Sequence, residues 1–146
     1  MRLEPLYSVR FRYPEDWAVE LSGPGGKEEY HFFIAEGTAT GRIAGRLRGA
    51  NHPRRRTDLT FVPDFQGVIE TEDGAVVMFD HQGYGRAYPA GRRQIVAAGF
   101  HFSSDPRYAW LNESLCVGCG EVRRLDDGET ELVIDFSELV WEAPAE

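Results

Sequence analysis

The sequence predicts an all-β fold, a closed antiparallel β-barrel of about eight to ten strands with one or two short helices. Apolar and polar residues alternate along several short stretches, glycine-containing turns separate these stretches, and helical periodicity is nearly absent. Closure removes the edge strands that an open sheet would expose to aggregation. We expect one domain, residues 1–146, because the chain has ordinary domain length and contains neither a linker nor a repeat.

Four stretches alternate with a period of two, which is typical of strands with one face on a core and the other in water. They are residues 7–13, 42–48, 65–71 and 131–136. Residues 30–35 and 75–79 are apolar at almost every position. These two stretches are therefore expected to be covered on both faces.

Turn residues separate the predicted strands. Residues 22–26 (SGPGG) indicate a hairpin loop, and residues 83–91 indicate a longer loop. Glu72-Asp73-Gly74 and Asp126-Asp127-Gly128 are typical of tight turns, because glycine accepts the positive φ that such turns need. Only residues 92–98 and 108–115 have helix-forming character, and each is long enough for about two turns.

Composition excludes several classes of partner. The net charge of -8 argues against nucleic acid, which requires a basic surface. Residues 54–56 are three arginines, with Arg46 and Arg48 upstream; we interpret them as a solvated loop in preference to a phosphate or acidic-ligand site. No apolar run approaches the length of a membrane span, and the first five residues lack a signal-peptide core. We therefore expect a cytoplasmic protein without membrane partners.

Two cysteines, Cys116 and Cys119, have the spacing of half a zinc knuckle or of a redox pair. A structural zinc site needs four ligands, and no second Cys or His pair lies nearby. The neighbouring Val117, Gly118 and Gly120 favour a strand, in which residues three apart point to opposite faces. Metal or redox use is therefore the minority interpretation.

Three motifs give the chain a resemblance to a known family. They are residues 107–112 (RYAWLN) followed by Val117, Gly118 and Gly120; Asp64 followed by residues 72–75 (EDGA) and Gly83; and the opening residues 3–7 (LEPLY). Together they resemble the domain of unknown function 3237 family, also called the uncharacterised protein family 0311, from Leu3 to about residue 136. The resemblance implies a calycin-like β-barrel with an internal pocket, often oligomeric, with no established reaction and no cofactor.

The chain also departs from the family pattern. Glu36 stands where the family tends to have glycine, and Asn51-His52 stands where Asp-Trp is common. The stretch after His101 is short, and Ser103 replaces a frequent acidic residue. Pocket chemistry found in one relative is therefore not transferred to this chain.

The four histidines, His31, His52, His81 and His101, are candidates for proton transfer near neutral pH. His81 follows an apolar strand and leads to Tyr84 and Arg86, at an expected barrel end. No histidine pair has the spacing that places two metal ligands on one strand face, so we expect no metal site. For most of these residues, packing or solvation is the alternative role.

The family motifs add further candidates. Asp64 is a candidate general base if it is buried, and a turn residue otherwise. Tyr108 and Asn112 offer hydrogen bonds, Trp110 offers an aromatic wall, and Arg107 offers a cation for an oxyanion. For Trp110 a role in closing one barrel end is favoured over ligand binding.

Three functions are compatible with these features. The first is a cofactor-independent isomerase, cyclase, lyase or hydratase acting on a small organic substrate inside the barrel. In it Asp64 or His101 takes a proton, Tyr108 or His81 returns one, and Tyr84, Arg86, Arg107, Trp110 and Asn112 bind substrate. The alternative is a lipocalin-like binding protein without catalysis, and a structural role is the third. From the family resemblance we also expect a homo-oligomer.

Overall fold

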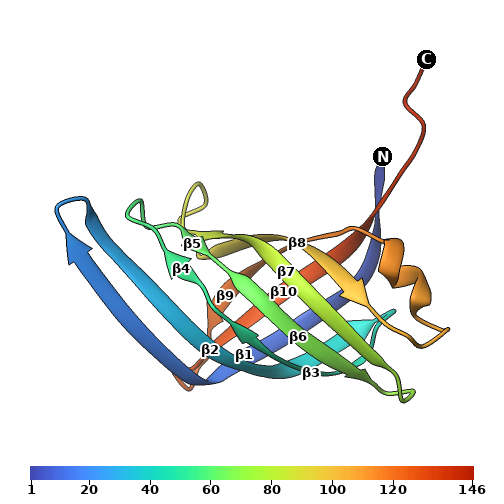
Figure 1. Cartoon of the computed structure of the whole chain (residues 1–146), viewed down its shortest axis with the longest axis horizontal. Helices are drawn as coiled ribbons and strands as arrows, with labels where there is room; N and C mark the ends of the chain where they lie inside the picture. Colours follow the sequence, from blue (N-terminus) through green and yellow to red (C-terminus); the bar gives the residue numbers. More distant parts are fainter.

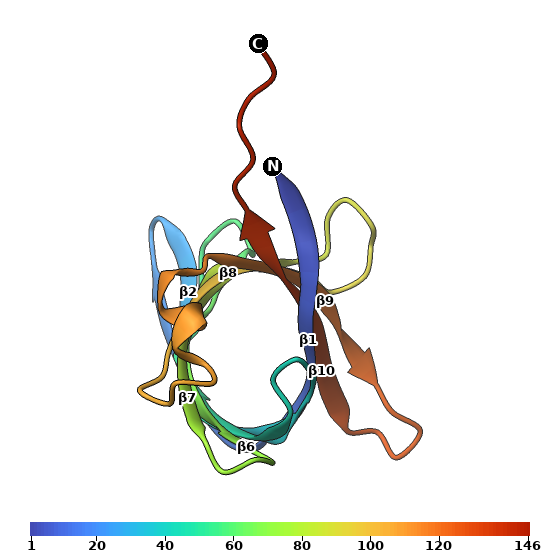
Figure 2. The ribbon, with the colours of Figure 1, turned by 90° about the vertical axis from the view of Figure 1, so that its right-hand side faces the viewer.

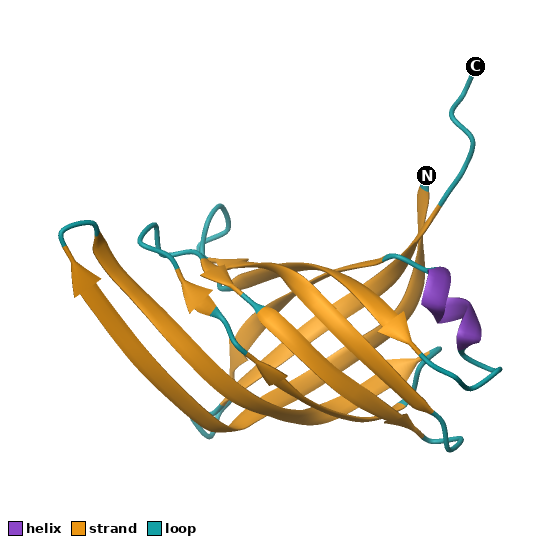
Figure 3. Ribbon diagram, viewed as in Figure 1, coloured by secondary structure: helices purple, strands orange, loops and turns teal.

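The computed structural model describes all 146 residues and contains one antiparallel sheet in which eight strands close into a ring (Figures 1 and 3). The ring order is β1, β10, β9, β8, β7, β6, β3, β2 and back to β1. Two short strands, β4 and β5, connect β2 with β7 at one end. The elements are β1 (Arg2–Gly23), β2 (Gly26–Gly41), β3 (Gly45–Asn51), β4 (Arg54–Arg55), β5 (Phe61–Val62), β6 (Asp64–Thr71), β7 (Val76–Arg86), β8 (Gln94–Phe102), the 3₁₀ helix η1 (Ala109–Glu113), β9 (Cys116–Arg124) and β10 (Thr130–Val140).

The two ends of the ring differ. At the hairpin end, on the left of Figure 1, β1 and β2 project beyond the ring, next to β4, β5 and the β7–β8 loop. At the helix end lie both termini, η1 and the β2–β3 and β6–β7 turns, and Figure 2 looks along the ring from this side. Ile43 from the β2–β3 turn and Leu111 from η1 are fully buried there. Apolar side chains therefore fill the helix end.

The inner face follows the alternation of the sequence. Tyr7, Val9 and Phe11 on β1 are buried, whereas Arg10 and Arg12 between and after them are exposed. The same holds on β6, where Phe65 and Ile69 are buried. The predicted strands and the Asp-Gly turns are confirmed, with positive φ at Gly74 and Gly128. Ile43 is the exception, because it lies in the turn before β3.

Three local predictions were wrong. Residues 92–98 do not form a helix, because β8 begins at Gln94, and Ile95 and Ala97 pack on the core between outward-facing neighbours. β7 continues through Gly83 and Gly85, so the loop starts only after Arg86. The stretches 30–35 and 75–79 are not covered on both faces, because no second layer lies outside the ring. Their outward side chains are exposed, namely Tyr30, Phe32, Val76 and Met78.

The second predicted helix, at residues 108–115, is the short 3₁₀ helix η1. No helix in the structure has the length and apolarity that a membrane crossing requires. The β9 strand confirms the prediction for the cysteines: Cys116 is buried on the inner face, and Cys119 is exposed on the outer face. The two thiols therefore cannot act as a pair.

A bulge in β1 reverses which face of the strand points inward. The pairing register with β2 shifts between Arg12 and Glu15. Beyond this bulge Trp17 lies opposite Phe32 and Val19 opposite Tyr30, and all four side chains are exposed. The projecting hairpin therefore carries its apolar residues on the outer face, the reverse of the ring.

Candidate active site

Three polar side chains meet in the interior of the ring. The Tyr7 hydroxyl lies 2.7 Å from Nε2 of His101 and 3.3 Å from Nε2 of His81. Tyr7 comes from β1, whereas the histidines come from β7 and β8, and β8 is three strands away from β1 around the ring. The hydrogen bonds therefore cross the interior, and we call these three residues the central cluster.

The central cluster is almost completely shielded from water. Tyr7, His81 and His101 are 4%, 5% and 1% exposed. Burial lowers the pKa of His101 to about 4 and, together with the neighbouring His101, lowers the pKa of His81 well below its usual range. Burial, together with the Cys116 thiol, raises the pKa of Tyr7 well above its usual value. All three groups are therefore neutral at pH 7.

Aromatic rings hold His81 in position. It stacks between Phe79 and Phe136, with centroid distances of 4.5 Å and 4.4 Å. Phe136 also stacks on Tyr7 at 5.2 Å. Cross-strand glycines make room for these rings: a Cβ at Gly99 would lie 2.3 Å from Cδ2 of His81, and one at Gly118 would lie 2.7 Å from Phe136. Glycine opposite an aromatic ring thus fixes the cluster from the neighbouring strands.

The hydrogen bonds of the cluster leave one fully buried nitrogen without a partner. A tyrosine hydroxyl has one proton, so Tyr7 donates to one Nε2 and accepts from the other. Nδ1 of His101 is buried and has no hydrogen-bond partner. Leaving a buried polar atom unpaired costs about 1–3 kcal/mol, so its presence in the interior calls for an explanation.

The inward positions become smaller toward the hairpin end. On β7, Phe79 and His81 are followed by Gly83, and on β8, His101 is preceded by Gly99 and then Ala97. Ala97 is only partly buried. Between the cluster and Ile95, the β7 and β8 wall is therefore lined by glycine and alanine.

A second polar pair lies toward the hairpin end on the opposite wall. Asn51 accepts the backbone N–H of Asp64 through Oδ1, at 3.0 Å, and donates from Nδ2 to the Tyr13 hydroxyl at 2.9 Å. The backbone bond fixes the orientation of the amide, so the Tyr13 oxygen accepts and its own proton stays free to donate. Burial raises the pKa of Tyr13 to about 12, so this donor keeps its proton.

The structure brings together only two of the four residues predicted to be catalytic, His81 and His101. Asp64 is exposed on the outer face, where it accepts hydrogen bonds from Gln66 and Gln82. Asp64 was predicted to be a general base only if it is buried. Its exposed position on the outer strand face therefore excludes that role. His31 binds Glu29 at the hairpin end, and His52 is exposed beside Phe32.

Tyr108 lies at the helix end, where its hydroxyl donates to Asp73 at 2.8 Å. Arg107 pairs with Asp105 and Asp73 there. Asn112 bonds both backbone groups of Ser103, accepting its N–H and donating to its carbonyl, which gives the amide a structural role. These residues stand apart from the central cluster and hold η1 against the ring.

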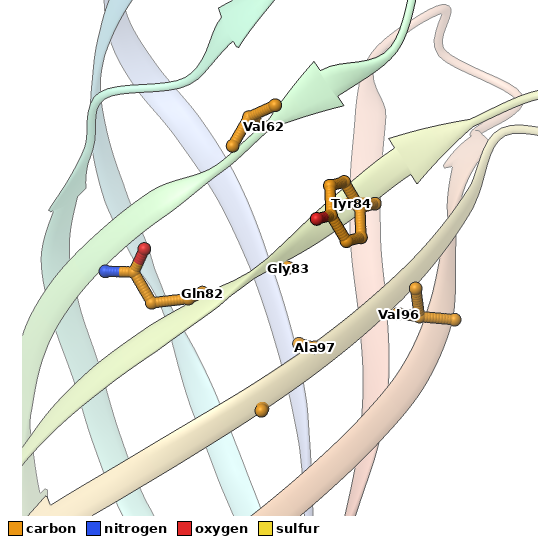
Figure 4. Close-up of a pocket in the computed structure, with 7 residues that line it drawn as sticks. Val62, Gln82, Gly83, Tyr84, Val96 and Ala97 are labelled. Carbon is orange, nitrogen blue, oxygen red and sulfur yellow. The ribbon is translucent and has the colours of Figure 1, made fainter.

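The remaining predicted binding residues are also outside the interior. Trp110 donates to the backbone of Arg107 and is covered by Arg42. Tyr84 and Arg86 are exposed on the outer face of β7. Tyr84 borders a hollow of about 400 Å³ that is also lined by Val62, Gln82, Gly83, Val96, Ala97 and Ala98 (Figure 4). None of the three residues of the central cluster lines this open hollow.

Tyr7, Tyr13 and Asn51 are polar site residues that the sequence motifs do not predict. Alternation marks Tyr7 and Tyr13 only as strand positions, and Asn51 differs from the family pattern. The available signal was the strand parity: both tyrosines share the inward face with Val9 and Phe11, and a buried tyrosine hydroxyl needs a partner.

Two comparisons bear on identity. Residues 1–139 match the model of a family described as "Protein of unknown function (DUF3237)". No relative was found among the curated proteins.

Several solved structures share the fold. A β-barrel-like protein from Acinetobacter baumannii is 21% identical with a TM-score of 0.72, and the match covers 94% of each chain. A protein of unknown function from Clostridium acetobutylicum is 18% identical with a TM-score of 0.77, covering 96% of this chain and all of the other. A protein from Penicillium herquei described as an enzyme is 20% identical with a TM-score of 0.63, covering 92% and 93%. At these identities the likeness establishes the fold alone.

Proposed function

Because the chain belongs to the DUF3237 family, whose description names no reaction, we propose its function from the geometry of the site. We infer a cofactor-independent enzyme that moves protons on a small organic substrate inside a calycin-like barrel. The observation that carries the proposal is the Tyr7 hydroxyl within hydrogen-bond distance of Nε2 on both His81 and His101. The description of a structurally similar protein as an enzyme agrees with this inference.

The neutrality of the cluster dictates how it works. Neither imidazole gains a charge easily in this dry interior, so a simple base that becomes an imidazolium is disfavoured. A relay avoids the charge. His101 takes a proton from substrate at Nδ1 and passes its Nε2 proton to the Tyr7 oxygen; Tyr7 passes its own proton to Nε2 of His81, which releases one from Nδ1. The cluster ends neutral, in its other tautomeric arrangement.

A relay of this kind removes one proton and delivers another. Such bifunctional transfer fits isomerisation and cyclisation best, and elimination or hydration next. The free Nδ1 of His101 is the atom that would meet the substrate. The small side chains of Gly83 and Ala97 lie along the approach from the hairpin end.

Hydrogen exchange tests the proposal without knowledge of the natural substrate. Enolisable aryl ketones are incubated with the protein in D₂O, and deuterium incorporation is followed by NMR. We expect enantioselective exchange above the buffer rate, and a loss of about 100-fold in Tyr7→Phe and His101→Gln, which interrupt the relay. Asp64→Asn, on the outer face, is the matched control. Equal exchange in all variants would contradict the relay.

A non-catalytic binding protein is the second candidate, favoured by the aromatic interior around Phe11, Phe65 and Phe79. In that case ligands bind without exchange, and the Tyr7→Phe variant retains them. The deuterium-exchange experiment therefore distinguishes a non-catalytic binding protein from an enzyme that transfers protons.

We further propose that the protein is a cytoplasmic homo-oligomer. The outer wall of β7 and β8 carries Val76, Met78, Phe100 and Phe102, each between 52% and 58% exposed. An apolar group of this kind supports an interface between copies. Light scattering should give a mass above 16.5 kDa for the wild type, and Phe102→Arg should lower it.

A further inference from the structure

Arginines gather at the hairpin end of a chain whose net charge is -8. Eight of the 15 arginines belong to this group. Arg54 and Arg55 form β4 and Arg56 follows it, Arg86 ends β7, Arg92 and Arg93 precede β8, and Arg123 and Arg124 end β9. Three carboxylates, Glu29, Asp58 and Glu121, pair with four of these arginines. The other four, Arg54, Arg86, Arg93 and Arg124, have no carboxylate within ion-pair distance.

Arg93 has the most informative position. It has no carboxylate within ion-pair distance, and it precedes β8 at the position that continues the inward series Ile95, Ala97 and Gly99. Its guanidinium carbon lies 5.3 Å from the ring centre of Phe61. Arg93 also borders a hollow of about 490 Å³ that it shares with Arg92, Arg123 and Arg124. An unpaired guanidinium thus lies where the interior meets this hollow.

The neighbouring walls are flat and aromatic. Tyr13 stacks on Phe33 at 4.4 Å, Phe33 stacks on His31 at 5.2 Å, and His31 contacts Phe61 at 5.6 Å. Across from them Ile95, Ala97 and Val122 pack on the core but stay partly exposed. This arrangement suits a planar apolar body between two walls.

Tyr13 supplies a directed donor at the same place. Asn51 already occupies one lone pair of the Tyr13 oxygen, and the hydroxyl proton has no protein acceptor. The Arg93 charge is close enough to affect the ionisation of Tyr13. A partly buried hydroxyl donor and an unpaired guanidinium are complementary to an oxyanion.

We propose that the hairpin end binds a planar apolar molecule that bears one carboxylate, with Arg93 and Tyr13 on the carboxylate. This names the substrate class of the proposed function and rests on it. The arginine-rich rim attracts such anions, and their apolar body lies along the small side chains toward the central cluster. Arg93 and Tyr13 are binding residues in this arrangement and take no part in proton transfer.

The test compares 2-naphthoate with its neutral isostere 2-naphthamide, using calorimetry on the full chain. We expect naphthoate to bind about tenfold more tightly, with an affinity that falls as salt is added. Arg93→Gln should lower naphthoate affinity about tenfold and leave naphthamide unchanged. Tyr13→Phe should weaken both ligands. Arg48→Gln, an unpaired arginine on the outer face of β3, is the charge-matched control and should change neither.

The proposal is overturned if neither probe binds, if the two bind equally, or if Arg48→Gln and Arg93→Gln have the same effect. Its failure is distinguishable from failure of the relay. Tyr7→Phe and His101→Gln should retain naphthoate binding while they abolish deuterium exchange. Exchange that depends on Tyr7, together with naphthoate binding that Arg93→Gln leaves unchanged, would refute the carboxylate site alone.

Discussion

The Tyr7 hydroxyl and Nε2 of His101 lie 2.7 Å apart although their strands face each other across the ring. A hydrogen bond between opposite walls links parts of the chain that are 94 residues apart. It also places the only phenol of the central cluster between two imidazoles. The stability of the fold and the proposed proton transfer therefore depend on the same short contact.

Replacing Tyr7 by phenylalanine should destabilise the fold. The substitution leaves both Nε2 atoms without their partner, and each unpaired buried group costs about 1–3 kcal/mol. Urea unfolding at pH 7.5 measures the loss. Tyr30→Phe is the control, since the Tyr30 hydroxyl bonds Glu28 in an exposed position, and we expect it to cost under about 0.5 kcal/mol. Equal losses in the two variants would speak against a strong central cluster.

Stability should fall as the solution is acidified below the usual histidine pKa. His101 has a pKa of about 4 in the folded protein and about 6.5 when unfolded, so between these values the unfolded chain binds more protons. The contribution of neutral His101 to the free energy of unfolding is complete above pH 6.5. It decreases by up to about 1.4 kcal/mol per pH unit toward pH 4. His81 acts in the same direction.

Urea midpoints at pH 7.5, 6.5, 5.8 and 5.2 measure this dependence above the range in which the carboxylates titrate. His101→Gln should make the profile shallower, because the residue no longer takes up a proton on unfolding. A profile that keeps its full slope in this variant would assign the dependence to other groups.

Gly99→Ala should displace His81. The added Cβ would meet the imidazole at 2.3 Å, and the ring is held by Phe79 and Phe136 on both faces. Overpacking of this kind costs about 1–3 kcal/mol. Gly25→Ala, where a Cβ meets nothing within 4 Å, is the matched control. Thermal unfolding compares their stabilities, and NMR shifts of the His81 ring should change only in Gly99→Ala.

The two thiols should react at very different rates. Cys119 is exposed, whereas Cys116 is buried and its pKa is raised to about 11 by burial and by Glu138. One thiol per chain should therefore react with a thiol reagent in the native protein, and the second should react only after unfolding in urea. Cys119→Ser should abolish the fast reaction. Fast release of two equivalents from the native chain would contradict the inward position of Cys116.

The all-β fold was predictable because its signals are local. Alternation along residues 7–13 and 65–71 marks the inner face, and Asp-Gly turns mark hairpins. Residues 92–98 were misassigned as helix because alanines and arginines favour helices, while the β8 pairings with β7 and β9 are long-range. The exposure of Val76 and Met78 could not be predicted either, because an apolar sequence does not show whether another element covers its outer face.

The site was less predictable. His81 and His101 were found because histidine is rare and chemically distinctive, but their meeting with Tyr7 depends on ring closure between distant strands. The RYAWLN motif drew attention to Tyr108, Trp110 and Asn112, which hold the helix end. Recognisable sequence here marks the scaffold, whereas the interior chemistry rests on residues that no short motif connects.

The bulge between Arg12 and Glu15 determines which side chains of β1 face the ring axis at the hairpin end. With one extra residue, the hairpin turns Asp16, Ala18 and Glu20 toward the ring axis and Trp17, Val19 and Leu21 outward. Removing a single residue there would exchange the two sets, so that the apolar side chains would face the ring axis and the polar side chains would face outward. One inserted residue thereby gives the hairpin a polar face toward the ring axis and an apolar face toward the outside.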